Sequence, residues 1–158
     1  LSAGVGLAVL AALMRGLTRK QSRTLGNVWV DVVRSTLYVL LPLSLIVSLL
    51  LVWQGVPQTM TASVPISALS DTTGGDQRIP MGAVASQVAI KQLGTNGGGF
   101  YSVNSAHPLE NPTPLSNLIQ VVSILLIPAA LCFSFGRLSG NMRHGMTARE
   151  ACLDVLKR

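Results

Sequence analysis

Long uncharged runs of apolar residues alternate with polar segments along this chain of 158 residues. Residues 35–54 and 115–136 carry no charged side chain and are rich in Leu, Ile and Val. As α-helices these runs are roughly 30 and 33 Å long, which matches the hydrocarbon layer of a membrane. Residues 1–14 form a third, shorter run, interpreted as the end of a transmembrane span. The pattern predicts an all-α membrane protein with transmembrane helices at 35–54 and 115–136.

Each predicted transmembrane helix contains one proline, Pro42 in the first and Pro128 in the second. A proline lacks the backbone N–H that the preceding turn requires. Within a membrane, neighbouring groups satisfy the carbonyl that is left over, so such helices bend rather than end. We therefore expect both helices to continue through their prolines.

Composition and charge support a membrane location. Hydrophobic residues make up 49% of the chain and charged residues 11%, whereas soluble domains carry about 25% charged residues. The net charge is +6, but the Lys and Arg residues gather beside the apolar runs and do not alternate with aromatic residues, which argues against nucleic acid. Residues 15–34 and 137–158 hold most of them. The positive-inside rule makes these two the cytoplasmic segments and places residues 55–114 outside.

The outer segment contains one apolar interruption, with a predicted extracytoplasmic loop at 55–81 before it. Residues 81–93 read MGAVASQVAIKQL, in which apolar side chains fall roughly on one helical face. At about 18 Å this helix would cross only half a bilayer. A short helix between two full spans is typical of a re-entrant pore helix, so we predict a pore helix and its loop at 82–99. Residues 100–114, which contain Pro108, Pro112 and Pro114, are predicted to be an extracytoplasmic connection.

The loop that follows the short helix is rich in glycine, and Gly94 stands at the helix C-cap. Bare backbone within a membrane is tolerated only where it is buried in protein or lines a water-filled cavity. Carbonyl oxygens of such a loop can replace the hydration shell of K⁺. The candidate selectivity-filter residues are Thr95, Asn96, Gly97, Gly98 and Gly99, with the carbonyls of Thr95, Asn96, Gly97 and Gly98 as K⁺ ligands and with Gly94, Phe100 and Glu110 in support.

The glycine run and the charged residues near it allow other interpretations. A glycine run is often only a flexible turn, and a phosphate-binding loop would require a GxxxxGK[ST] pattern that is not present. Glu110 either draws cations to the loop or braces it through backbone amides, and Lys91 either extends outward or pairs with an acid such as Glu110. No nucleophile–base pair, carboxylate dyad or metal-ligand cluster is found in the sequence, so no catalytic residue or cofactor is predicted for this chain.

Several longer motifs are more specific. The runs AIKQLGTNGGGF, NSAHPLENPTPLSN and LLIPAALCFSFGR, together with LGNVWVDVVRSTLYVLLPLSL, resemble the KdpA family, the potassium-binding, channel-like subunits of Kdp-type potassium-transporting ATPases. The resemblance implies the span–re-entrant pore helix–selectivity loop–span repeat of the Trk/Ktr/Kdp superfamily. It makes this chain a fragment that covers roughly the second of four such repeats, and it places the filter at Thr95 to Gly99.

The resemblance also implies partners and a location. K⁺ would pass from an extracytoplasmic filter toward a P-type ATPase subunit, which hydrolyses ATP with Mg²⁺, and small accessory subunits would complete the complex. The protein would be a multi-pass protein of the bacterial plasma (inner) membrane. The alternative is a stand-alone Trk/Ktr-like K⁺ transporter or channel without an ATPase partner.

Overall fold

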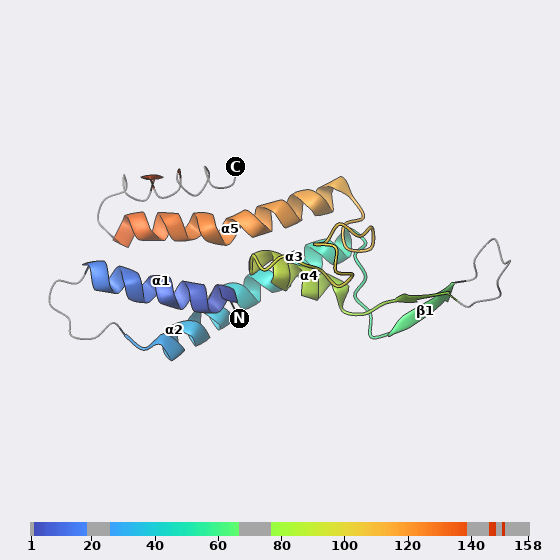
Figure 1. Ribbon diagram of the computed structural model, residues 1–158, viewed down its shortest axis with the longest axis horizontal. Coiled ribbons are helices and arrows are strands. Elements are labelled where there is room, and N and C mark those ends of the chain that lie inside the picture. The colour runs from blue at the N-terminus through green and yellow to red at the C-terminus, as the bar shows by residue number, and fades with distance from the viewer. Residues whose placement is uncertain (1, 19–25, 67–76, 139–145, 148–149, 151–158) are drawn as a thin grey trace.

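The computed structural model describes residues 2–18, 26–66, 77–138, 146–147 and 150, which form an elongated, mostly helical structure (Figure 1). Parts of the predicted segments 15–34, 55–81 and 137–158 lie outside the described residues. Along the chain the elements are α1 (Ser2–Thr18), α2 (Val28–Ser35), η1 (Thr36–Leu40), α3 (Leu41–Trp53), β1 (Ser63–Ile66), β2 (Gln77–Pro80), α4 (Val84–Leu93) and α5 (Pro114–Leu138).

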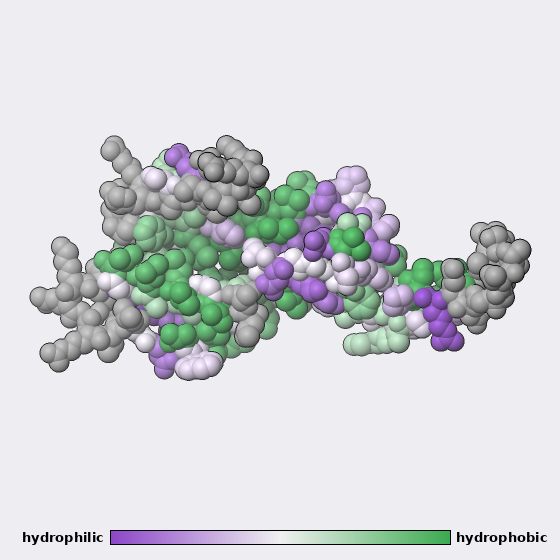
Figure 2. Space-filling view, in the orientation of Figure 1, coloured by the Kyte–Doolittle hydropathy of each residue, from purple (hydrophilic) through white to green (hydrophobic). Residues whose placement is uncertain are grey.

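Among the described residues, two helices are long and apolar enough to cross a membrane. One is the continuous helix Val28–Trp53, formed by α2, η1 and α3, and the other is α5. An 18-residue stretch of each has a mean hydropathy of 2.3, and only 11% and 17% of these two stretches are buried inside the structure. Figure 2 shows hydrophobic surface over the long helices, and more polar surface around the loops that join α4 to α5. Such exposed apolar helices fit lipid or further protein as surroundings better than water.

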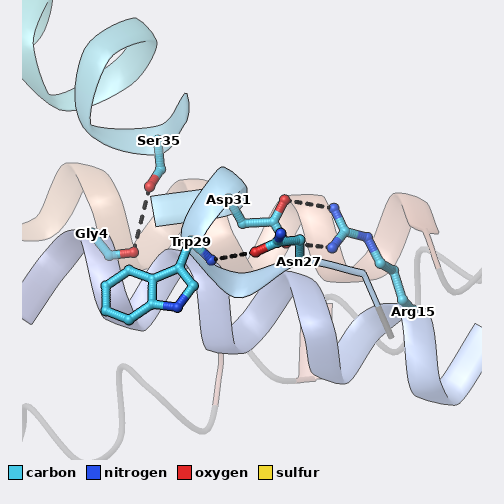
Figure 3. Close-up of polar contacts among 6 residues, drawn as sticks. All are labelled: Gly4, Arg15, Asn27, Trp29, Asp31 and Ser35. Atoms are coloured by element: carbon cyan, nitrogen blue, oxygen red, sulfur yellow. Dashed lines mark hydrogen bonds and ion pairs between the residues drawn. The ribbon is translucent and has the colours of Figure 1, made fainter. Parts of the chain in front are cut away.

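The first long helix begins at Val28, seven residues before the predicted residue 35. Its first turn is capped by Asn27, whose side-chain oxygen accepts a hydrogen bond of 3.0 Å from the Trp29 amide (Figure 3). An Asn cap satisfies one of the amides that a helix start leaves unpaired. The early start brings the charged residues Asp31 and Arg34 into the helix, ahead of the uncharged run that begins at residue 35.

Asp31 is kept in the helix by an ion pair with Arg15 of α1 (Figure 3). The guanidinium bonds both carboxylate oxygens, with Nη2 lying 2.9 Å from Oδ1. Ser35 adds a longer contact of 3.4 Å to the carbonyl of Gly4. Gly26, at φ +97°, passes so close to Arg15 that a Cβ there would lie 2.5 Å from the guanidinium nitrogen Nη1. These contacts join α1 to the start of the long helix.

The long helix continues through Pro42 by means of one wide turn. The amide of Leu41 donates to the carbonyl of Thr36, five residues earlier, so residues 36–40 form a π-helical segment. Pro42 then occupies the first turn of α3, where its missing N–H costs least. Pro128 likewise lies inside the continuous helix α5. The structure thus agrees with the expectation that neither proline ends its helix.

The segment predicted only as a loop at 55–81 contains a two-stranded antiparallel hairpin. β1 and β2 pair from Ser63 with Pro80 to Ile66 with Gln77, and the hairpin extends away from the helices (Figure 1). Its base is tied to α4, because the side chain of Gln58 accepts from the Ser86 amide at 3.1 Å and donates to the Ser86 hydroxyl at 3.1 Å. The hairpin was missed because β1 is only four residues long and contains a proline.

The short helix α4 lies between α3 and α5 and supplies most of the core. Val84, Ala85, Val88 and Ala89 are completely buried. α1 lies between α2 and α5 and points its N-terminal end toward the C-terminal end of α4 (Figure 1). A cavity of about 190 Å³ lies where these two ends meet, lined by residues from α1, α4 and α5 together with Gly94 and Thr95.

We predict that Asp31→Asn lowers the free energy of unfolding by about 1 kcal/mol, because it removes one partner of a partly exposed, two-point ion pair. The measurement is the melting temperature of the purified full-length protein in detergent. Arg78→Gln is the matched control, since Arg78 is an exposed arginine of β2, apart from the Arg15–Asp31 pair. Equal shifts for both variants would contradict a specific role for the pair.

Candidate functional site

The glycine-rich loop begins where α4 ends. The Gly94 amide donates to the carbonyl of Ile90 at 2.9 Å, as in a regular helix, and Gly94 has a right-handed backbone. The change of backbone hand comes one residue later, at Thr95, with φ +53°. Helices commonly end in a left-handed residue, but that residue is usually glycine. For a β-branched residue such as threonine this conformation is strained.

Strained backbone is concentrated in this part of the chain. Among the described residues, the non-glycine residues with positive φ are Thr95, Ser102, Asn104 and Ser105. Gly97 and Gly98 in the same stretch have φ +67° and +75°. Each strained residue costs about 1–3 kcal/mol and persists only where the surroundings enforce it. The loop is therefore a built structure held by specific contacts, and not the flexible turn that a glycine run suggests.

Asn104 and Ser105 hold the loop from its far side. The Asn104 side-chain oxygen accepts from the Gly98 amide, and the Ser105 hydroxyl lies 3.5 Å from the Gly98 carbonyl. Neither residue was assigned to the site from the sequence. Their only signal was membership of the NSAHP motif that follows the glycines.

A buried chain of amide side chains connects the loop to both neighbouring helices. Gln92 of α4 donates to the Ser105 hydroxyl at 3.1 Å and to the side-chain oxygen of Gln120 in α5 at 3.0 Å. Gln120 donates in turn to the Glu110 carbonyl at 2.9 Å. All four residues are at most 5% exposed. Buried amides are stable only when paired, so this network fixes the loop relative to α4 and α5.

Glu110, predicted as a supporting residue, is completely buried. Its Oε1 accepts from the Tyr101 amide at 3.0 Å, whereas Oε2 has no hydrogen-bond partner among the described residues. A Cβ on Gly99 would overlap Oε2, so only glycine fits there. Of the two roles considered for Glu110, the structure shows the bracing contact with a backbone amide.

The aromatic residues after the glycines pack beside the loop. Phe100 lies against Gly82, where a Cβ would come within 3.1 Å of its ring. Tyr101 stacks on His107 with ring centroids 4.2 Å apart and donates its hydroxyl to the Pro80 carbonyl at 2.7 Å. Burial, followed by the charge of Glu110, raises the pKa of the Tyr101 phenol, so this hydroxyl keeps its proton at neutral pH. These contacts fix the loop to the base of the β-hairpin.

Lys91 takes neither of its two expected positions. Its ammonium donates to the Gly99 carbonyl at 3.2 Å and does not form an ion pair with Glu110 in the described structure. It also lies 3.6 Å from the position of a Cβ on Gly98. The positive charge is therefore directed at the end of the loop.

The loop carbonyls differ in their contacts. Gly99 accepts from Lys91, and Gly98 has only the long contact to Ser105. The carbonyls of Thr95 and Gly97 accept no hydrogen bond from the described residues. Among the described residues there is also no group of three or more His, Cys, Asp or Glu side chains that could hold a metal ion. The site thus offers neutral backbone oxygens, a donor set suited to a weakly held monovalent cation.

The two long apolar helices and the buried short helix between them define a helical membrane protein. The chain belongs to the KdpA family, because the family model described as potassium-transporting ATPase A subunit matches residues 1–155.

Curated relatives agree with this assignment. A protein of Solidesulfovibrio magneticus is 55% identical over 96% of the chain, and one of Sorangium cellulosum is 60% identical over 95%. A protein of Pseudomonas aeruginosa is 60% identical over 90% of the chain. All three are named potassium-transporting ATPase potassium-binding subunit. The matches cover 29%, 27% and 25% of these relatives, so the chain spans little more than a quarter of their length.

We predict that Gln92→Met lowers the free energy of unfolding by about 1–3 kcal/mol, because it leaves the buried oxygen of Gln120 without its donor. The melting temperature of the full-length protein in detergent measures the effect. Gln87→Met in the same helix is the matched control, since Gln87 is only partly buried and has no side-chain bond in the network. A stable Gln92→Met protein would show that the network does not hold the loop.

Proposed function

We propose that the protein containing this chain binds K⁺ and translocates it as a subunit of an ATP-driven uptake complex. The observation that carries the proposal is the loop Thr95–Gly99, which follows the end of α4, begins with the left-handed residue Thr95, is held by Asn104, and presents backbone carbonyls. The names of the relatives, potassium-binding subunits of a potassium-transporting ATPase, support K⁺ as the ion.

The K⁺ ligands in this proposal are the carbonyls of Thr95, Asn96, Gly97 and Gly98. Support comes from Thr95 and Gly97, whose carbonyls are not used by the described residues, and from the left-handed turns that expose backbone at the loop. Potassium requires several weak oxygen ligands, and one loop supplies only part of that set. The remaining ligands would come from parts of the protein beyond this chain.

The arrangement of the membrane segments in the proposal follows the resemblance. Helix Val28–Trp53 spans outward, α4 re-enters from the outer side, the loop lies within the membrane, and α5 spans inward. The burial of α4 between α3 and α5 supports this order, because a short helix surrounded by spans can reach membrane depth without facing lipid. The protein would be a multi-pass protein of the bacterial inner membrane.

The partner in the proposal is a P-type ATPase subunit that hydrolyses ATP with Mg²⁺, accompanied by small accessory subunits. K⁺ would pass from the loop toward this subunit. The relatives' names favour an ATPase subunit over the alternative, a stand-alone Trk/Ktr-like transporter or channel. Uptake of K⁺ by a transport-deficient bacterial strain, with and without the partner genes, separates the two. Uptake that requires the partner supports the proposal, and uptake without it supports the alternative.

We predict that Gly98→Asp raises the K⁺ concentration for half-maximal uptake by about tenfold or more. The substitution places a side chain at φ +75°, where L-residues are strained, so it displaces the backbone carbonyls to which the proposal assigns K⁺. Uptake by the strain described above, carrying the complete set of genes, measures the effect.

Two further variants make the result specific. Gly98→Ala tests the backbone alone and should weaken K⁺ uptake less than Gly98→Asp. Gly6→Ala is the control, because a Cβ at Gly6 meets nothing within 4 Å. Normal uptake at low K⁺ by the Gly98→Asp strain would remove the loop from the proposal.

A further inference from the structure

Two side chains of opposite charge contact Gly99 from different directions. Lys91 donates to its carbonyl at 3.2 Å. The Glu110 carboxylate lies against its Cα, so close that a Cβ there would overlap Oε2. The two charges form no direct ion pair, since the only described ion pair within 4.0 Å joins Arg15 and Asp31. Gly99 therefore stands between an ammonium and a carboxylate.

The burial of the Glu110 carboxylate is costly, and bracing the loop does not account for its charge. The group is completely buried, receives one hydrogen bond from the Tyr101 amide, and leaves Oε2 without a partner in the described structure. A buried carboxylate is unfavourable unless hydrogen bonds and a positive charge compensate it. Lys91 brings such a charge to the same residue. The bracing of Tyr101 alone would be served equally well by a neutral glutamine.

The sum of the two charges determines which ions suit the loop. With both present, the loop end has no net charge, and binding depends on carbonyl dipoles. Without Lys91, the remaining carboxylate attracts a divalent cation twice as strongly as a monovalent one, because the Coulomb energy is proportional to the charge of the ion. Without Glu110, the remaining ammonium repels every cation.

We propose that Lys91 and Glu110 are specificity-determining residues that act as a balanced pair and keep the loop selective for monovalent over divalent cations. The inference rests on the proposed function, since it concerns the ions that this loop accepts. It assigns to Lys91 a role beyond the positioning of one carbonyl, and to Glu110 a role beyond the support of the Tyr101 amide.

The test uses the full-length protein assembled with its ATPase partner. K⁺-stimulated ATP hydrolysis is measured against K⁺ concentration, and inhibition is measured with Ba²⁺, a divalent cation close to K⁺ in size. We expect Lys91→Met to lower the inhibitory Ba²⁺ concentration by about tenfold or more, since a unit charge a few ångströms away has at least this effect. Lys91→Arg keeps the charge and should retain the wild-type Ba²⁺ sensitivity.

The double variant separates charge balance from structure. Glu110→Gln should raise the K⁺ concentration for half-maximal hydrolysis by about tenfold, because it leaves Lys91 uncompensated. Lys91→Met combined with Glu110→Gln removes both charges and leaves the loop end neutral. The inhibitory Ba²⁺ concentration and the K⁺ concentration for half-maximal hydrolysis should then both return to within about threefold of the wild type. Purely structural roles would make the double variant at least as impaired as the worse single variant.

Arg78→Met is the matched control. It removes one positive charge from β2, away from the loop, and should leave Ba²⁺ inhibition unchanged. Equal Ba²⁺ inhibition of Lys91→Met and wild type would overturn the inference, as would a double variant without recovery. If the Glu110→Gln protein does not assemble, the inference is tested by comparing Ba²⁺ inhibition of Lys91→Met with that of Lys91→Arg.

The Gly98→Asp complex shows which proposal fails. If Gly98→Asp weakens K⁺ stimulation while Lys91→Met leaves Ba²⁺ inhibition unchanged, only the charge-balance inference is wrong. If the wild-type complex itself is not stimulated by K⁺, the proposed function is wrong, and the inference fails with it.

Discussion

The structure of the loop depends on one buried network of hydrogen bonds. Gln92 in α4, Ser105 after the loop, Gln120 in α5 and the carbonyl of Glu110 are linked by bonds of 2.9–3.1 Å, and all four residues are buried. Within an apolar environment such groups have few alternative partners, so the network has one favoured arrangement. It joins three pieces of chain: α4, the segment after the loop, and α5. The strained left-handed backbone of Thr95 persists because both ends of the loop are fixed in this way.

The apolar packing around α4 completes this arrangement. Its buried face consists mainly of valines and alanines, which allow α3 and α5 to approach closely. The N-terminus of α5 is secured by Thr113, which accepts from the Ser116 amide at 3.0 Å and donates to Gln54 at the end of α3 at 2.7 Å. The C-terminal end of α3 and the N-terminal end of α5 are thereby joined next to the loop. The loop is thus positioned by α4 and α5 together with the irregular segment that follows it.

Much of the helical fold could be predicted from the sequence, because an uncharged apolar run of membrane length rarely forms anything but a transmembrane helix. α5 begins and ends within two residues of the predicted 115–136. The early start at Val28 could not be predicted in this way, since the uncharged run begins only at residue 35 and the contact of Asp31 with Arg15 joins residues 16 positions apart. For the site, the glycines indicated where the backbone is special. The roles of Asn104, Ser105 and Gln92 are tertiary contacts between polar residues, which no local pattern indicates. The assignment of K⁺ ligands remains a prediction.

The π-helical turn at Thr36–Leu40 has a consequence for the helix that contains it. One extra residue in a single turn rotates everything beyond it by about 100° around the helix axis. The N-terminal part of the helix, α2, can therefore face α1, while its C-terminal part, α3, faces α4. The N-terminal and C-terminal parts of one continuous helix thus direct their contact faces to different sides. One face meets α1 beside the Arg15–Asp31 pair, and the other packs against α4 next to the loop.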